Sequence, residues 1–344
     1  MRDGMKTMSK MHSGANVGSG AVPLVELWRG DLLESLHRGH AVVARASGEV
    51  VEAWGRADAL IYPRSSCKMV QALPLLESGA GRDLGREHLA LACASHQGGR
   101  IHVERVARWL GDLGLSEGDL RCGCQDAQDI EERDRLVRAG AAAGQLHNNC
   151  SGKHAGFLTL NQHLGGDSEY VTPDHPVQIA VRTAFEEVTE MPAPGYGIDG
   201  CSAPNFATTV AALAGGMARF ASAGDGNARS RAMVRLREAM MAHPDLVAGE
   251  TRACTELMRA MDGRAAIKTG AEAVFVAILP QAGLGIALKI VDGGVRAAEA
   301  AITALLIRHG ALAADHPVVA RYIGPTRNRR DIVTGETRLA PGFA

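Results

Sequence analysis

The chain has few aromatic residues, almost no net charge and no long apolar run. Phe, Trp and Tyr together make up 4% of the 344 residues, and the formal net charge is -1. Binding of nucleic acid usually needs a basic excess, so we expect no nucleic-acid partner. No apolar stretch approaches the roughly 20 residues that cross a bilayer, so we expect no membrane partner. The remaining composition, 46% apolar and 22% charged, is typical of a globular protein.

The first twenty residues also lack the apolar block of roughly 7–15 residues found in a secretory signal. They contain four methionines with several glycines and serines. We therefore expect residues 1–20 to form a disordered tail of a cytoplasmic protein. A glycine-rich phosphate loop following a strand is missing as well, which disfavours nucleotide binding.

The seven cysteines form an odd set that contains no Cys-x-x-Cys pair. In a large chain without a secretory signal, a disulfide framework is not expected. Metal binding, catalysis or burial must then account for them. Their positions are Cys67, Cys93, Cys122, Cys124, Cys150, Cys201 and Cys254.

Strand patterns stand near both ends of the chain, and helical patterns fill the middle. Two valine-rich runs around Ser47-Gly48 predict a β-hairpin, and residues 64–79 predict a helix that ends at Gly79. From about 85 to 260, apolar residues recur at three- and four-residue spacing, which predicts helices. Residues 273–294 predict a second hairpin, and a further helix follows it.

This order of elements predicts an α/β fold of the α+β type. An antiparallel sheet built from both chain ends would be flanked by helices and joined to a helical lobe. We expect one catalytic unit over 21–344, with a sheet lobe of 21–80 and 262–344 and a mostly helical lobe of 81–261. The active face would lie between the two lobes. The segment 321–341 is expected to add an edge strand.

The strongest chemical signal is the sequence SSCK, residues 65–68, near the start of the first predicted helix. At i and i+3, Ser65 and Lys68 lie on one face of a helix. Much later, Lys268 begins a Lys-Thr-Gly sequence that leads into an apolar strand pattern. Ser-x-x-Lys with a later Lys-Thr-Gly is typical of acyl-serine enzymes such as β-lactamases and penicillin-binding proteins. For the short motif alone, the alternative is a helix cap followed by a surface lysine.

Serine acts as a nucleophile when a base within hydrogen-bond reach removes its proton. Lys68 can be that base for Ser65 if burial or a neighbouring cation lowers its pKa from about 10.4. Lys268 is the candidate cation. Ser66 should point to another side of the helix, and Cys67 should be buried.

The small residues of the segment LACASH indicate a helix end or a tight turn around Ser95. There Ser95 can face the nucleophile and relay a proton to the leaving amine. The alternative is a simple capping serine.

The segments NNCSGKH and DGC form a candidate metal site. Thiolates are strong zinc ligands, but Cys150 and Cys201 supply only two of the four usual ligands. His154 can be a third ligand on general grounds. Lys153 can bind a metal only after it loses its proton, so zinc affinity would then fall with falling pH. The alternative is a pair of buried free cysteines.

Taken together, these segments resemble the rhizobial-type class 3 L-asparaginases, also called the asparaginase II family. The resemblance runs from about Leu24 to the C-terminal region and is carried by several long matches. These are RSSCKMVQALPLLESG, LACASH, LRCG, NNCSGKHAGFL, PDHPVQ, GIDGCSAPNFA, HPDLVAGETRACTELM, KTGAEAVF and GIALKIVDG. Cys67, Met69 and Cys124 depart from the family pattern, but none of them removes a catalytic group.

The resemblance implies a fold similar to serine β-lactamases and glutaminases, a homodimer, and hydrolysis of L-asparagine to L-aspartate and ammonia. Ser65 would attack the side-chain amide carbon with Lys68 as its base. Lys268 and Ser95 would tune charges and pass a proton to the departing ammonia. Another Ser–Lys amidohydrolase, such as a glutaminase or a β-lactamase-like enzyme, and a non-catalytic zinc-binding module are the alternatives.

The resemblance also implies zinc as a cofactor. Its ligands would be Cys150, Lys153 and Cys201, with water completing the shell. Charge complementarity makes Arg64 and Asp199 candidates for holding the α-carboxylate and α-ammonium groups of the substrate. His154 is a further substrate-binding candidate.

Overall fold

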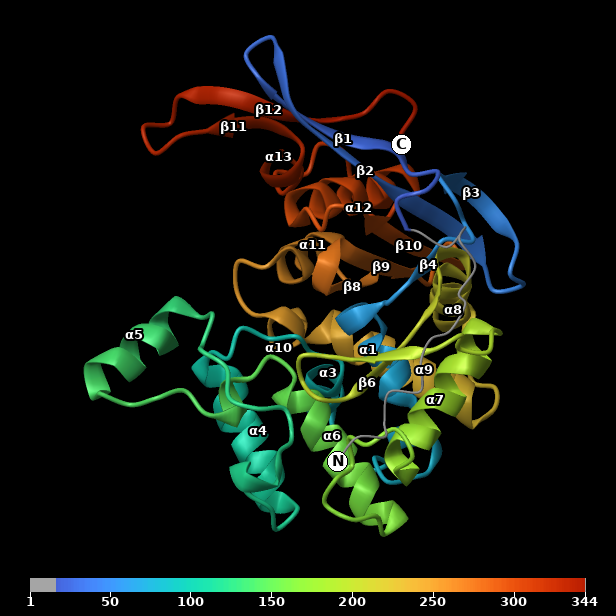
Figure 1. The fold of residues 1–344 in the computed structure, drawn as a ribbon, viewed down its shortest axis with the longest axis vertical. Helices are drawn as coiled ribbons and strands as arrows, with labels where there is room; N and C mark the ends of the chain where they lie inside the picture. Colours follow the sequence, from blue (N-terminus) through green and yellow to red (C-terminus); the bar gives the residue numbers. More distant parts are fainter. Residues whose placement is uncertain (1–16, 344) are drawn as a thin grey trace, which may run out of the picture.

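The computed structural model describes residues 17–343. Its centre is an antiparallel sheet to which both ends of the chain contribute (Figure 1). The strand order is β11-β12-β1-β2-β10-β9-β8, with β3 beside β2. The predicted α/β fold of the α+β type, with an antiparallel sheet built from both chain ends, is confirmed. The strands are β1 (Val22–Arg29), β2 (Leu32–Arg45), β3 (Val50–Trp54), β8 (Ala266–Gly270), β9 (Val274–Leu279), β10 (Leu284–Ile290), β11 (Gly324–Arg327) and β12 (Val333–Leu339).

Two helices pack on this sheet. α12 (Val295–Arg308) contacts β9, β10 and β1, and α8 (Val210–Ser222) contacts β10, β2 and β9. Every residue of β9 and β10 is buried, and their sequences VFVAIL and LGIALKI are apolar apart from Lys289. Strands covered on both faces must be apolar at nearly every position. These two strands therefore form the centre of the core that hydrophobic burial stabilises.

The middle of the chain forms the helices drawn below the sheet in Figure 1. The helical pattern predicted over 85–260 is confirmed, although two small sheets interrupt it. One pairs β4 (Leu60–Ile61) with β7 (Thr208–Thr209), and the other pairs β5 (Tyr196–Ile198) with β6 (Pro204–Phe206). The helices are α3 (Arg86–Ala92), α4 (Arg100–Asp112), α5 (Ile130–Ala139), α6 (Ser151–Leu164), α7 (Pro176–Thr189), α9 (Ala228–Ala242), α10 (Pro244–Ala248) and α11 (Ala253–Met261).

The helix predicted over 64–79 is divided into three short pieces. A 3₁₀ turn, η1 (Arg64–Cys67), leads into α1 (Lys68–Gln71), and α2 (Leu73–Glu77) follows. Pro74 accounts for the break, because it has no N–H to bond the carbonyl four residues earlier. Gly79 ends the run at φ +85°, as the sequence predicts.

Both predicted hairpins are present, as β2–β3 and β9–β10, and Gly48 takes φ +86° in the first of them. The strand β1 was not predicted, because its apolar pattern is short. The expected edge strand in 321–341 is β11, at one end of the sheet. The strand β12 lies between β11 and β1.

Residues 1–16 of the expected tail lie outside the described residues. Residues 17–20 form turns, and His40 Nε2 donates a hydrogen bond to Val17 O over 2.7 Å. Among the helices of residues 17–343, none has the length and apolar character that a bilayer span requires. All seven cysteines lie in this part of the chain, and none of them forms a disulfide.

Gly285 lies where β10 meets α8, and an added side chain would collide with the helix backbone. A Cβ there would lie 2.1 Å from Ala218 N and 2.2 Å from Ala214 O. Gly285→Ala should therefore lower the free energy of unfolding by about 1–3 kcal/mol, the usual effect of overpacking, as measured by urea denaturation. Gly111→Ala is the matched control, because a Cβ at that helical position meets nothing within 4 Å and Ala favours a helix over Gly. Equal losses in the two variants would contradict the packing account.

Candidate functional site

The segments that carry the two predicted motifs are in contact. The end of β8 packs against η1, so closely that a Cβ on Gly270 would lie 2.6 Å from Pro63 O and 2.9 Å from Ser66 N. Only glycine fits at this approach. The contact brings the Ser-x-x-Lys segment beside the Lys-Thr-Gly segment, which is necessary if the two motifs are to form one site.

Within the SSCK segment, the Ser65 hydroxyl is the one nucleophilic group that is neither buried nor hydrogen-bonded. Ser65 is partly exposed, and its hydroxyl makes no hydrogen bond within residues 17–343. The Ser66 hydroxyl is buried and donates to Pro63 O over 2.7 Å. Cys67 is buried, as predicted, and burial raises the pKa of its thiol to about 12. Neither neighbour is therefore available to attack a substrate.

Lys68 is buried one 3₁₀ turn after Ser65, and its ammonium is surrounded by acceptors. Nζ donates to Ala94 O, to Cys150 Sγ over 3.1 Å and to Asn149 O over 3.5 Å. A protonated lysine supplies three donors and no acceptor, which matches these contacts. No hydrogen bond joins Lys68 to Ser65.

Lys268 and Ser95 form a hydrogen-bonded Ser–Lys pair. Lys268 Nζ donates to Ser95 Oγ over 2.9 Å and to Thr269 O over 2.7 Å, and both side chains are buried. Burial, assisted by the positive charge of Lys68, lowers the pKa of Lys268 to about 7. Lys268 therefore loses its proton more readily than an exposed lysine. The sequence predicts Lys268 as a cation beside Lys68, whereas burial lowers the pKa of Lys268 itself.

The three predicted metal ligands lie in one buried cluster. Cys150 precedes α6, Lys153 lies one turn into that helix, and Cys201 comes from the turn between β5 and β6. Lys153 Nζ donates to Cys201 Sγ over 3.0 Å. The side-chain contact between the two cysteines lowers the pKa of Cys201 well below its ordinary value and raises that of Cys150, whose thiol also lies 2.9 Å from Asn149 Oδ1. Of the two sulfurs, that of Cys201 is therefore the one that ionises first, to a thiolate.

Lys153 balances this thiolate. Burial alone would lower the pKa of Lys153, but the neighbouring Cys201 and Cys150 sulfurs raise it overall. Without a metal, Lys153 is therefore an ammonium paired with the charge on Cys201.

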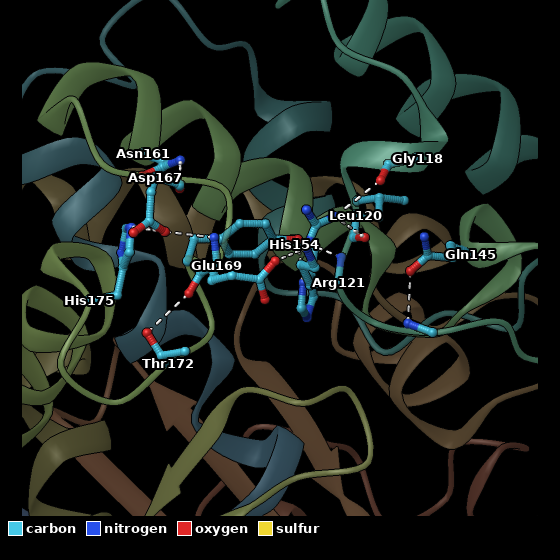
Figure 2. A network of polar contacts seen from close by, with 12 residues as sticks. Gly118, Leu120, Arg121, Gln145, His154, Asn161, Asp167, Glu169, Thr172 and His175 are labelled. Atoms are coloured by element: carbon cyan, nitrogen blue, oxygen red, sulfur yellow. Dashed lines mark hydrogen bonds and ion pairs between the residues drawn. The ribbon is translucent and has the colours of Figure 1, made fainter. Parts of the chain in front are cut away.

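His154, next to Lys153 in α6, belongs to the polar network drawn in Figure 2. Its Nδ1 lies 2.9 Å from the Tyr170 hydroxyl, which also accepts a hydrogen bond from Arg121 N over 2.9 Å. The network runs from His154 through the Tyr170 hydroxyl to Arg121 and on to Glu169 (Figure 2). The ion pair between Arg121 and Glu169 is 2.8 Å long. These contacts hold the His154 ring in place.

The network also sets which ring nitrogen of His154 carries the proton. A backbone N–H can only donate, so among the described residues the Tyr170 proton has His154 Nδ1 as its acceptor. The ring proton then lies on Nε2, which is buried and has no hydrogen-bond partner in residues 17–343. Burial lowers the pKa of His154 to about 4, against the opposing effect of Cys201. His154 therefore presents a neutral N–H toward the cysteine cluster rather than a free lone pair.

The cluster of Cys150, Lys153 and Cys201 fits a zinc ion in its donor chemistry. Sulfur and nitrogen donors suit zinc, and a buried N–H beside a bound thiolate is a common supporting contact. Residues 17–343 contain no group of three or more His, Cys, Asp and Glu side chains arranged to hold a metal. A metal at this position must therefore use the Lys153 amine, after that amine loses its proton.

The predicted substrate-binding pair, Arg64 and Asp199, forms an ion pair. Arg64 Nη2 and Nε lie 2.8 and 3.1 Å from Asp199 Oδ1, which also accepts from Gly200 N over 2.8 Å. Oδ2 of Asp199 accepts no hydrogen bond within the described residues. The ion pair offsets both charges, and it leaves Arg64 Nη1 and Asp199 Oδ2 without a hydrogen bond among the described residues.

A cavity of about 350 Å³ adjoins Arg64. Glu272 and Lys289 are its other charged lining residues, and the remaining wall is mostly apolar. Neither Ser65 nor Lys268 lines it. The cavity therefore lies beside the Ser–Lys site rather than over it.

Several contacts of the site were missed by sequence reasoning. The carbonyls of Ala94 and Asn149 leave no mark in a sequence, because every residue has one. Tyr170 stands outside every motif that bears on chemistry. Asn205 contacts the backbone of Arg64, and its place in the segment GIDGCSAPNFA was the only available signal.

A family model agrees with the resemblance that the sequence shows. The family model for L-asparaginase II matches residues 25–339. No curated protein sequence matches the chain. Among solved structures, a β-lactamase from Mycobacterium bovis is 13% identical, with a TM-score of 0.41 and coverage of 80% of this chain and 95% of that one. A Bacteroides dorei protein described as a β-lactamase is 12% identical, with a TM-score of 0.41 and coverage of 77% and 92%. Because the family model spans nearly the whole described chain, this protein belongs to the L-asparaginase II family.

Proposed function

We propose that the protein hydrolyses the side-chain amide of L-asparagine to L-aspartate and ammonia. Membership of the L-asparaginase II family supports an amidohydrolase that acts on a small-molecule amide. The observation that carries the proposal is an uncommitted Ser65 in the turn that packs against β8, the strand whose Lys268 is buried and hydrogen-bonded to Ser95. Burial also lowers the pKa of Lys268 to about 7. A nucleophile and a base that is neutral at working pH are the two groups that acyl-serine catalysis needs.

The first half of the reaction forms a β-aspartyl ester. Ser65 Oγ bonds to the amide carbon and loses its proton, which passes through Ser95 to the neutral Lys268. The carbon–nitrogen bond then breaks, and the departing NH₂ group takes that proton from Lys268 and leaves as ammonia. In the second half, water attacks the ester carbon and gives a proton to Lys268. The bond from that carbon to Ser65 Oγ then breaks, Lys268 returns the proton to Oγ through Ser95, and L-aspartate leaves.

Lys68 has a supporting role in this scheme. Its charge helps to lower the pKa of Lys268, and its contacts tie together Ala94, Asn149 and Cys150. The prediction that Lys68 itself is the base for Ser65 is the competing arrangement, because 3₁₀ geometry brings i and i+3 into line. The pH dependence given below separates the two.

Charged and polar groups around Ser65 would bind the rest of the substrate. The backbone N–H of Ser65 would donate to the oxyanion, and such a donor is typically worth about 2.7–4 kcal/mol. Asp199 would hold the α-ammonium through its available oxygen, and Arg64 the α-carboxylate. His154 would affect substrate binding indirectly, through the cysteine cluster, because its Nε2–H faces that cluster.

Zinc would be held by Cys150, Lys153 and Cys201. When bound, it would supply positive charge that organises the pocket and helps to hold substrate. We also propose that the protein works in the cytoplasm and, on the family resemblance alone, that it is a homodimer.

Substrate and nucleophile are tested together by measuring ammonia release from L-asparagine and L-glutamine. The wild type should act on L-asparagine, and Ser65→Ala should lower kcat by roughly 10³-fold or more. Ser66→Ala is the matched control and should stay within a few-fold of wild type, because the Ser66 hydroxyl is committed to Pro63 O. Preference for L-glutamine, or turnover of nitrocefin instead, would identify a different Ser–Lys hydrolase. Equal activity of Ser65→Ala and wild type would refute the role of Ser65.

The pH dependence tests which amine is the base. The kcat/KM for L-asparagine should rise with pH through about 7, because the neutral form of Lys268 is the one that accepts a proton. Lys268→Met should abolish this rise in kcat/KM and lower the rate by roughly 10²–10⁴-fold. If the same rise persists in Lys268→Met, Lys68 is the base instead.

Metal analysis tests the zinc proposal independently of activity. The purified wild type should contain one zinc per chain, and Cys150→Ser and Cys201→Ser should lose it, as measured by elemental mass spectrometry. Cys124→Ser is the matched control, because Cys124 is exposed and outside the cluster. Full zinc content in Cys201→Ser would rule out this ligand set.

A further inference from the structure

The residue directly before Ser65 has an unfavourable backbone conformation. Arg64 takes φ +52°, in the left-handed region that residues with a Cβ usually avoid. Such a conformation persists only when surrounding contacts hold it. The direction of the Ser65 side chain depends on it, since the two residues share a peptide bond.

One side chain holds both polar backbone groups of Arg64. Asn205 Oδ1 accepts a hydrogen bond from Arg64 N over 3.0 Å, and Asn205 Nδ2 donates to Arg64 O over 3.3 Å. Asn205 lies in β6 and is 2% exposed. A buried amide with both ends bonded to one residue fixes that residue strongly, because neither group can turn to water.

The hairpin that carries Asn205 also contacts the Arg64 side chain. Asp199, which follows the paired strand β5, forms the ion pair with the Arg64 guanidinium. The hairpin thus holds Arg64 by its backbone on one side and by its charge on the other. Gly270 closes the opposite side of the turn, where it approaches Pro63 O and Ser66 N.

We infer that Asn205 is a positioning residue for the nucleophile. It keeps Arg64 in the left-handed conformation and so sets the direction of the Ser65 hydroxyl and of the Ser65 N–H. This inference rests on the proposed role of Ser65. The same hairpin carries Cys201, so one small element sets both the nucleophile and the cysteine cluster.

The direct test is Asn205→Ala, with kcat and KM for L-asparagine measured alongside the rate at which a small sulfonyl fluoride labels Ser65, located by peptide mass mapping. Both kcat and the labelling rate should fall on the order of 100-fold, the scale of a misplaced reacting group. The KM should change less than kcat, because the variant removes no group that touches substrate and acts on the α-carboxylate partner Arg64 only through its backbone.

A second background separates positioning from general stability. Glycine adopts positive φ without penalty, so in the Arg64→Gly background the further change Asn205→Ala should slow labelling by no more than about threefold. Asn161→Ala is the matched control, a buried asparagine whose Nδ2 bonds Asp167 O on the outer part of the helical region. It should leave kcat and labelling near wild type even if it lowers the free energy of unfolding.

Two results would overturn the inference. One is an unchanged labelling rate in Asn205→Ala, and the other is an equally large loss in the Arg64→Gly background. A wild type whose Ser65 is labelled but which releases no ammonia from L-asparagine would end the proposed function alone. In that case the labelling rates still decide the role of Asn205.

Discussion

The close approach of β8 to the turn before Ser65 is the contact on which the site depends. It joins segments that are far apart in the chain, and it needs a residue without a side chain at Gly270, where a Cβ would lie 2.6 Å from Pro63 O. Through it, the strand that carries Lys268 is fixed beside the turn that carries Ser65. Pairing with the fully buried strand β9 holds β8, the last strand of the sheet, in register, so the position of Lys268 follows from the core. The chemistry therefore rests on backbone packing more than on any single polar contact.

Within this frame, the buried amines differ because their neighbours differ. Lys153 faces a thiolate, which raises its pKa despite burial. Lys268 faces a hydroxyl and a carbonyl and lies near the charge of Lys68, so burial lowers its pKa to about 7. An isolated buried charge is unfavourable. Lys153 keeps its charge and pairs with Cys201, whereas Lys268 loses its proton more readily. Two buried lysines of the same site therefore differ in the direction in which their pKa is shifted.

Much of this fold could be predicted from the sequence, and the parts that could not be predicted have identifiable causes. Periodicity predicted the hairpin at Gly48, the buried strands β9 and β10 and the helical middle, since these patterns are local. It missed the break that Pro74 makes in the first helix, and the short strand β1. For the cluster of Cys150, Lys153 and Cys201, the residues alone offered two thiolate ligands, with buried free cysteines as the alternative. The family resemblance added Lys153, because a turn of one hairpin meets the start of a distant helix. The ion pair of Arg64 with Asp199 and the left-handed backbone of Arg64 depend on long-range contacts that no local pattern encodes.

The central claim is that Ser65 becomes covalently acylated during turnover. The most direct measurement is rapid acid quenching of the enzyme during steady-state turnover of L-asparagine, followed by peptide mass mapping. The account predicts an aspartyl group in ester linkage to Ser65, absent when substrate is omitted. Turnover with no acyl group on Ser65 at any quench time, or an acyl group on a different residue, would contradict it.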